Sequence, residues 1–449
     1  MAGGTFISQN KIVPGVYINT RSEGNLPVSV SDKGIVAICK ALSWGETGVV
    51  KTYLVGTDPT PIIGNNILSD EALFLREMSK GSDTTPAPIK VLIYRPTGTS
   101  GVKATATVGA LTIDAKYVGT RGNDITVVIA ADPDNVGFYN ISVVVDGAVV
   151  ASDYVDDLDN LESNEWVDYT GTGTTITTTA GTALVGGVDP TVSATDHAAF
   201  MTAIEPYTFD ILCYDGSDGT TALAYTAFAT RMSNVLGKKC QVVMGGASAQ
   251  NSEWAINTIN GVKLSDGTTI DTQKATYWLA GAEAGAPYNK SLTYAQYPGA
   301  VESYPKKTAD EIEAAIRGGN IVFIDEFEST KICKDINTLT TFTVEKHKEY
   351  SKNRVMRVLN QLCNDLYKNY SLYYIGKVDN NPTGRELLRG WVIGYLNEMQ
   401  ANNGIQDFNV EDVTVAPGQE SDTVVITIAI MPVDSVEVVY ATVNVRTIA

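Results

Sequence analysis

The segment Ile321–Glu326, with the sequence IVFIDE, has the residue types of a nucleotide-hydrolase strand whose acidic end helps to hold magnesium. Nucleotide hydrolysis also needs a glycine loop whose backbone N–H groups cradle phosphates, with a lysine directly after the second glycine. The nearest candidate, Gly45–Thr52 (GETGVVKT), has the wrong spacing. The acidic segment is therefore interpreted as a buried strand that ends in acidic loop residues.

The segment Asp215–Gly219, DGSDG, resembles part of a calcium-binding loop, because Ca²⁺ binds several oxygen ligands. The bidentate glutamate that closes an EF-hand loop is missing, and Ala227 stands twelve residues after Asp215. The pattern favours a strand-to-helix turn in which Ser217 or Asp218 caps the helix.

Other residues that could carry catalysis are dispersed along the chain. His197 and His347 stand in no metal-ligand pattern, so we expect both on the surface. No serine stands in a G-x-S-x-G elbow. The five cysteines have neither metal-binding nor redox spacing, which predicts free, buried thiols; they are Cys39, Cys213, Cys240, Cys333 and Cys363. We therefore predict no catalytic residues, no metal and no cofactor, and we do not expect an enzyme.

A basic segment between Glu345 and Arg357 stands out in an acidic chain. It has five basic and two acidic residues, which gives it a net charge of +3. The basic residues are Lys346, Lys348, Lys352, Arg354 and Arg357. The segment is either the solvated face of a helix or a docking surface for an acidic protein partner.

Bulk composition limits the class of protein. A chain of 449 residues that is 44% hydrophobic and 19% charged has the composition of a soluble globular protein with two to four domains. The net charge of −18 argues against nucleic acid as a partner. No apolar run reaches the ~20 residues of a membrane span, so no membrane insertion is expected. The N-terminus has no basic n-region and no apolar h-region, so no secretory signal is expected.

The order of expected elements predicts a multidomain α/β (α+β) protein. Apolar strand-like runs alternate with helical patterns over residues 30–96 and 191–330, which predicts one discontinuous α/β core with a mainly parallel sheet. Residues 97–190 interrupt it with period-two patterns, the Asp146-Gly147 hairpin signal, and 13 acidic against 3 basic residues. This segment is predicted to be a β-rich, acidic, peripheral insertion.

The two ends of the chain differ from this core. Residues 1–29 read as an N-terminal arm that contains a short strand, Val16–Thr20. Residues 331–449 form a C-terminal domain with two amphipathic helices, followed by strand-like runs at Thr423–Ile430 and Val436–Val445. A terminal strand with free backbone groups can complete the sheet of another chain.

Four ordered motifs in the C-terminal third resemble the tail sheath family of contractile phage tails. They are Ile336–Thr340 (INTLT), the Val355–Leu366 helix, Gly390–Leu396 (GWVIGYL) and Met431–Glu437 (MPVDSVE). Pro14–Tyr17 also resembles the opening of the family. The chain is most similar to sheaths of Gram-positive myophages, defective prophages and R-type bacteriocins.

The resemblance implies a structural subunit that forms stacked hexameric rings around a tail tube and contracts to drive the tube through a bacterial envelope. Residues 331–449 would face the tube through the five basic residues named above. Both arms would exchange strands between subunits; the residues are Val16, Tyr17, Ile18, Asn19, Val436, Val438, Val439, Tyr440 and Val443. Family partners are other copies of the chain, the tail tube protein, the baseplate and the tail terminator.

Two alternatives stay open. The chain could be the sheath of another contractile injection system, or an α/β enzyme with an inserted β domain. Perturbed carboxylates in a cleft at the carboxyl ends of the parallel strands would favour the enzyme. In the sheath interpretation the protein is part of a virion tail or a phage-tail-like particle, assembled in the cytoplasm of the bacterial host.

Overall fold

The computed structural model describes residues 3–4, 16–17, 33–248 and 250–446. The chain divides into two compact units. The α/β unit comprises residues 31–364 and 432–449, and the C-terminal unit comprises residues 1–30 and 365–431. No helix among the described residues is long and apolar enough to cross a membrane.

A seven-stranded sheet organises the α/β unit, in the order β19-β15-β14-β13-β3-β5-β4. All neighbours pair in parallel except β4, which is antiparallel to β5. The strands are β3 (Ile35–Cys39), β4 (Val50–Leu54), β5 (Lys90–Tyr94), β13 (Ile211–Tyr214), β14 (Gln241–Gly245), β15 (Ala255–Thr258) and β19 (Asn320–Ile321). This confirms the predicted mainly parallel sheet.

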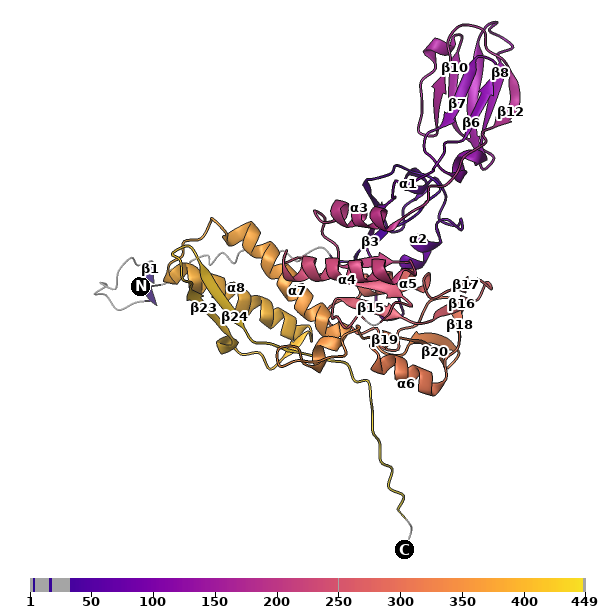
Figure 1. Ribbon diagram of the computed structural model, residues 1–449. Coiled ribbons are helices and arrows are strands. Elements are labelled where there is room, and N and C mark those ends of the chain that lie inside the picture. The colour runs from indigo at the N-terminus through magenta and orange to yellow at the C-terminus, as the bar shows by residue number, and fades with distance from the viewer. Residues whose placement is uncertain (1–2, 5–15, 18–32, 249, 447–449) are drawn as a thin grey trace. The chain divides into compact units, whose positions relative to one another are not determined.

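Helices cover both faces of this sheet, which explains why its central strands are apolar throughout (Figure 1). Side chains of β3 alternate between two cores: Val36 and Ile38 pack towards α2 and α5, and Ile35 and Ala37 towards α3 and α4. The helices are α1 (Thr60–Ile63), α2 (Leu73–Met78), α3 (Ala194–Ile204), α4 (Gly219–Asn234), α5 (Ala275–Gly285) and α6 (Ala309–Arg317). The capping residue predicted for α4 is Asp218, whose carboxylate accepts from Thr221 N at 2.7 Å.

Residues 97–190 fold as a β-sandwich with its own core. One sheet has the order β10-β9-β8-β12 and the other β11-β7-β6. The strands are β6 (Thr105–Val108), β7 (Leu111–Ala115), β8 (Ile125–Ala131), β9 (Tyr139–Val145), β10 (Ala148–Val155), β11 (Val167–Thr170) and β12 (Thr179–Ala183). Asp146 and Gly147 form the predicted hairpin turn, with φ values of 52° and 78°.

The sandwich is joined to the core by more than its two connecting segments. The Arg95 guanidinium donates to the carbonyl oxygens of Leu42, Gly45 and Val118, so it spans both parts. Arg121 makes the reciprocal contact, since its Nε donates to Gly64 O at 2.9 Å. Trp44 belongs to the sandwich core although it follows β3 in the chain. The insertion is therefore fixed to the α/β core.

Smaller sheets complete the α/β unit. One has the order β17-β16-β18, and a hairpin joins β20 to β21. The strands are β16 (Gly261–Leu264), β17 (Thr269–Ile270), β18 (Ala300–Tyr304), β20 (Phe323–Glu326) and β21 (Ser329–Ile332). The segment 321–326, interpreted above as one buried strand, is thus divided between the main sheet and this hairpin. Thr308 and Glu311 form a capping box at the start of α6, as the T-x-x-E spacing favours.

The C-terminal unit consists of helices and short strands. Helix α7 (Asn353–Asn369) begins in the α/β unit and ends in this one, and a π-helical turn follows at Tyr370–Tyr374. Asn381 caps α8 (Pro382–Ala401), with its side chain accepting from Gly384 N at 2.8 Å. The strands are β1 (Gly3–Gly4), β2 (Val16–Tyr17), β22 (Ile405–Gln406), β23 (Val413–Pro417), β24 (Val424–Ile428) and β25 (Met431–Pro432).

Candidate assembly interface

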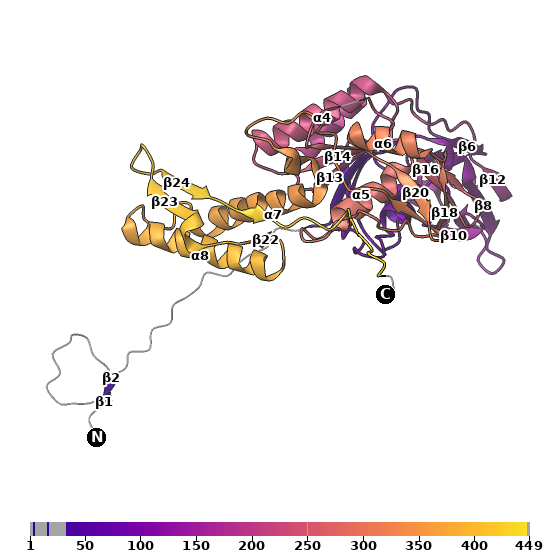
Figure 2. The ribbon, with the colours of Figure 1, turned by 90° about the horizontal axis from the view of Figure 1, so that it is seen from below.

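The hairpin of β23 and β24 covers helix α8 with one of its faces (Figure 2). The strands pair antiparallel, with Val413 opposite Ile428 and Val415 opposite Ile426. Because successive side chains alternate between faces, Val413, Val415, Val424 and Ile426 point inward while Thr414 and Thr427 are exposed. The alternating sequence explains why this segment forms a half-buried sheet.

The outer edge of β24 has unpaired backbone groups. Gly418 N donates to Thr423 O and Ala429 N to Asp412 O, each at 2.9 Å, which fixes the pairs that bond across the hairpin. The N–H and C=O groups of Val424, Ile426 and Ile428 therefore point to the opposite side. No strand among the described residues pairs there. This edge is able to accept a third strand.

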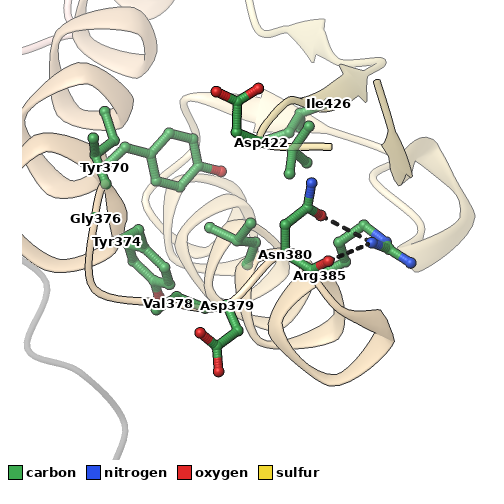
Figure 3. Close-up of a pocket in the computed structure, with 12 residues that line it drawn as sticks. Tyr370, Tyr374, Gly376, Val378, Asp379, Asn380, Arg385, Asp422 and Ile426 are labelled. Carbon is green, nitrogen blue, oxygen red and sulfur yellow. Dashed lines mark hydrogen bonds between the residues drawn. The ribbon is translucent and has the colours of Figure 1, made fainter. Parts of the chain in front are cut away.

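A pocket of about 290 Å³ lies beside this edge (Figure 3). Arg385 donates to Asn380 Oδ1 at 2.9 Å, and Asn380 Nδ2 donates to the carbonyl oxygens of Ser421 and Thr423, so these polar groups hold the rim. Burial raises the pKa of Tyr370 and of Tyr374, so both phenols stay neutral. The lining residues are Tyr370, Tyr374, Ile375, Gly376, Val378, Asp379, Asn380, Arg385, Leu388, Asp422, Val424 and Ile426.

The C-terminal segment, residues 433–446, forms no strand in the described structure. Its apolar side chains are instead open to solvent: Val439 is 77% and Tyr440 96% exposed. Val436, Val438, Val443 and Val445 are also exposed. The predicted terminal strand therefore has the sequence of a strand but no partner among the described residues.

The predicted N-terminal strand is described only in part. Val16–Tyr17 forms β2, which pairs in parallel with Gly3–Gly4. Ile18 and Asn19 lie outside the described residues, as does most of the predicted arm at 1–29.

The five basic residues predicted to face the tube do not form one surface. Lys348 is exposed, and half-buried Lys346 forms an ion pair with Glu253. Lys352 is mostly buried and pairs with Glu437 and with Asp434, the latter at 3.3 Å. Arg354 is half-buried, and Arg357 is buried. The amphipathic pattern of α7 explains this, because Arg357 falls on its inward face.

Arg357 is the centre of a buried ionic cluster. Its guanidinium pairs with Glu283 and, at 2.6 Å, with Asp335, and Asn353 Nδ2 donates to both carboxylates. Burial and the neighbouring Asp335 charge raise the pKa of Glu283 well above its usual value. Burial also acts to raise the pKa of Asp335, but Arg357 and the Leu292 N–H outweigh it and lower that pKa. Of the two carboxyl groups, Glu283 is therefore the one that holds a proton more readily.

The carboxyl ends of β3 and β13 are where an enzyme of this architecture would bind substrate, because the strand order reverses between them. Lys40 and Asp215 follow these strands, and Lys40 Nζ lies 2.6 Å from both Asp215 Oδ2 and Tyr277 OH. Asp196 and Asp218 each cap a helix. The charged groups at this position thus serve to hold the fold.

His197 lies nearby. The sequence predicts it on the surface, but the structure places it partly inside. Its ring is half-buried between Tyr214 and Tyr225, and its Nδ1 lies 2.9 Å from Tyr225 OH. Burial lowers the pKa of His197, which favours the neutral ring. Among the described residues, no group of His, Cys, Asp and Glu side chains could hold a metal ion.

Comparison with known proteins covers almost the whole chain. Family models match residues 99–189 (phage tail sheath protein beta-sandwich domain), 191–338 (phage tail sheath protein central domain) and 345–446 (phage tail sheath C-terminal domain). The crystal structure of a sheath tail protein from Desulfitobacterium hafniense is 38% identical, with a TM-score of 0.84 over 94% of this chain and 97% of that one. The chain belongs to the phage tail sheath protein family.

Two further proteins are similar to this chain over nearly its whole length. The phage-like element PBSX protein XkdK of Bacillus subtilis (strain 168) is 32% identical over 99% of this chain and 100% of its own length. The contracted helical sheath of the anti-feeding prophage is 11% identical, with a TM-score of 0.57 over 97% of this chain and 99% of that one, and shares the fold.

Family membership confirms the resemblance found in the sequence. The sheath protein is a structural component of a phage tail or tail-like particle and is not an enzyme. The mixed α/β, multidomain architecture with a β-sandwich is confirmed as well. The sequence analysis missed the unpaired edge of β24 and its pocket, because the pocket is lined by two segments more than 30 residues apart in the chain.

Proposed function

We propose that this chain is the subunit of a contractile sheath that polymerises as stacked hexameric rings around a tail tube. Contraction of the polymer drives the tube through a bacterial envelope. The observation that carries the proposal is the combination of an unpaired strand edge with an exposed, strand-like C-terminal segment in a member of the sheath family. The contracted sheath that shares this fold supports contraction.

In this proposal the C-terminal segment of one copy adds to the outer edge of β24 in a second copy. Val439, Ala441, Val443 and Val445 alternate along the segment and make one uniformly apolar face. That face would point inward, over the pocket, while the face with Tyr440 and Thr442 points outward. Fully burying a valine side chain contributes about 1.5–3 kcal/mol before the cost of association.

Backbone pairing suits a contracting polymer. A ladder of hydrogen bonds resists pulling, while the flexible connector next to it lets the joined bodies rotate. The N-terminal residues Val16, Tyr17, Ile18 and Asn19 are proposed as the second exchanged strand. Val16→Pro should weaken polymerisation, since proline removes a ladder donor, and unchanged tubes in electron micrographs would contradict this role.

The proposed contact with the tail tube is narrower than the sequence suggested. Lys346 and Lys348 belong to the exposed segment 340–349. In contrast, Lys352 pairs with Glu437, Arg357 pairs with Asp335, and Arg354 is half-buried. An acidic tube surface would be the complementary partner. Charge reversal of Lys346 and Lys348 to Glu should make assembly on the tube salt-sensitive, and normal tails from that variant would remove them from the interface.

The baseplate and the tail terminator are the further proposed partners, at the two ends of the polymer. The particle is a phage tail, an R-type bacteriocin or another contractile injection system, assembled in the bacterial cytoplasm.

The strand exchange can be tested by joining two different copies. One copy carries Val443→Cys and the other Leu388→Cys in the pocket, and the two are mixed before polymerisation and then oxidised. We expect a disulfide-linked dimer on a non-reducing gel, together with tubes or rings in electron micrographs. The matched control replaces Val443→Cys by Thr442→Cys, on the opposite face, and a protein without added cysteines shows the background from Cys333 and Cys363.

Each possible outcome tests a different part of the proposal. Tubes without the Val443 cross-link would reject the β24 edge as the acceptor and leave the sheath function standing. Equal cross-linking from both faces would reject the inward orientation. A wild-type protein that stays monomeric at all concentrations would reject the polymer itself.

A further inference from the structure

Glu437 is much less exposed than the residues that follow it in the C-terminal segment. The Glu437 side chain is only 9% accessible, although its neighbours Val436 and Val438 are open to solvent. Its carboxylate accepts a hydrogen bond from Thr293 Oγ1 at 3.0 Å and forms ion pairs with Lys352 and, at 3.4 Å, with Lys334. Glu437 is therefore bound by three side chains of the α/β unit.

These three partners come from separate parts of that unit. Lys334 follows β21, Lys352 directly precedes α7, and Thr293 lies in the loop after α5. Thr293 Oγ1 also accepts from Asp335 N at 3.0 Å, which connects this site to the buried cluster around Arg357. The binding site of Glu437 is thus connected to the buried interior of the unit through Thr293 and Asp335.

We propose that Glu437 anchors the C-terminal segment to the α/β unit and so positions the strand that is donated to a neighbouring copy. This inference rests on the proposed strand exchange and names the residue that directs it. Among the described residues that follow Glu437 in the chain, 438–446, none has a hydrogen bond or ion pair to the rest of the chain. Residues 438–446 consequently leave the unit from a fixed point.

The anchor acts by shortening the tether. Without it, the segment after β25 would be held only by the pair of Asp434 with Lys352, which contributes little because Asp434 is 42% exposed. Residues 433–446 would then act as one free tether, whereas with the anchor only residues 438–446 are free. The effective concentration of a tethered group falls roughly as the −3/2 power of tether length. Shortening the tether by about a third therefore raises the local concentration of the strand by about twofold. A fixed direction of departure adds to this gain.

Glu437→Gln tests the anchor, because it keeps the shape of the side chain and removes the charge that Lys334 and Lys352 bind. Asp434→Asn is the matched control, since Asp434 contacts the same Lys352 but is 42% exposed. A fluorescent probe at the C-terminus of the unassembled full chain reports the motion of the segment through its anisotropy. The lowest protein concentration that gives tubes in electron micrographs reports the positioning.

We expect Glu437→Gln to lower the anisotropy and to raise the concentration needed for tubes by at least about twofold, with unchanged thermal unfolding. Glu437→Asp, which keeps the charge, should restore part of both values, and Asp434→Asn should change neither by as much. An unchanged anisotropy would overturn the anchor. A lower anisotropy with tubes at the wild-type concentration would overturn the positioning role.

These readouts also separate this inference from the proposed function. Wild-type chains that form no tubes would count against the sheath polymer, and the anisotropy comparison would still decide whether Glu437 holds the segment. Tubes that form normally from every variant would leave the sheath function intact and reject Glu437 as a positioning residue.

Discussion

The β-sandwich and the C-terminal segment are both β-like in sequence, yet they bury their apolar residues in opposite ways. In the sandwich, inward-facing residues of both sheets, such as Ile129, Ile141 and Val143, are almost completely buried. In the C-terminal segment, valines in an equally regular alternation are exposed. The difference teaches that the same period-two pattern can be paired and covered within one chain, as in the sandwich, or left without a partner among the described residues, as in the C-terminal segment.

The number of available partners explains the contrast. Seven strands in two sheets give every apolar face of the sandwich a facing surface. A single terminal strand has neither a backbone partner nor a facing layer, so its apolar residues stay in water until a sheet accepts it. Burial is therefore decided by the surroundings of a strand as well as by its sequence.

The largest effect should come from proline in the C-terminal segment. Val439→Pro or Val443→Pro removes a ladder donor and fixes φ, so we expect no tubes in electron micrographs. Thermal unfolding of the soluble protein should stay unchanged, because both side chains are exposed in the described structure. The matched control is Val136→Pro, in an exposed turn of the sandwich, which should still form tubes. Tubes from the Val443→Pro protein would show that the C-terminal segment does not have to pair as a strand for assembly.

The opposite result is expected for a truncation inside the sandwich. Ile141→Ala should lower the free energy of unfolding of the sandwich by about 2–5 kcal/mol, because it leaves a cavity in a packed core. Val438→Ala, at an exposed position, should change stability by less than about 0.5 kcal/mol. Calorimetry measures the stability of both variants. Equal losses of stability would show that the C-terminal segment is buried as fully as the sandwich core.

The buried cluster around Arg357 should respond to pH through unfolding and not through assembly. The pKa of Glu283 is raised in the folded protein, so its contribution to stability is complete below the unfolded carboxyl pKa of about 4.3. This contribution is lost as the pH rises towards the folded pKa. Asp335 has a lowered pKa, so its contribution is present above about pH 4 and is lost as the pH falls through the folded pKa.

Glu283→Gln should therefore remove the loss of stability on the alkaline side of about pH 5, because glutamine imitates the protonated side chain. Asp335→Asn, in contrast, should destabilise the protein at neutral pH by leaving Arg357 with too little negative charge. Melting temperatures between pH 4 and pH 9 check both variants. A Glu283→Gln protein with the wild-type pH profile would show that Glu283 is not the carboxyl group that holds a proton more readily.

The smallest effect on assembly is expected from removing the sandwich altogether. Pro96 would be joined to Thr191 by a short linker, with Trp44→Ser to avoid exposing an indole that packs in the sandwich core. Since the two sheets of the sandwich cover each other's apolar faces, the protein that lacks the sandwich should still form tubes. Dispersed monomers that remain folded by circular dichroism would instead make the sandwich part of the lattice.

Much of the fold could be predicted because strong local signals agreed with it. The alternation of strands and helices gave the parallel sheet, and Thr308 with Glu311 gave the capped start of α6. The sequence places His197 on the surface because it stands in no metal-ligand pattern, but its contacts with Tyr214 and Tyr225 come from other elements. Long-range contacts of this kind leave no trace in a local window of sequence.

By itself, the sequence determined the family, the division into an α/β core and a β-rich insertion, and the strand-like pattern of the C-terminus. These follow from apolar periodicity and ordered motifs, which are local properties of the chain. Only the tertiary structure decided which groups are used internally. It buries Arg357 between Glu283 and Asp335, binds Glu437 to Lys352, and leaves the edge of β24 open. The physical reason is that charge pairing and strand pairing depend on distances between segments far apart in the chain.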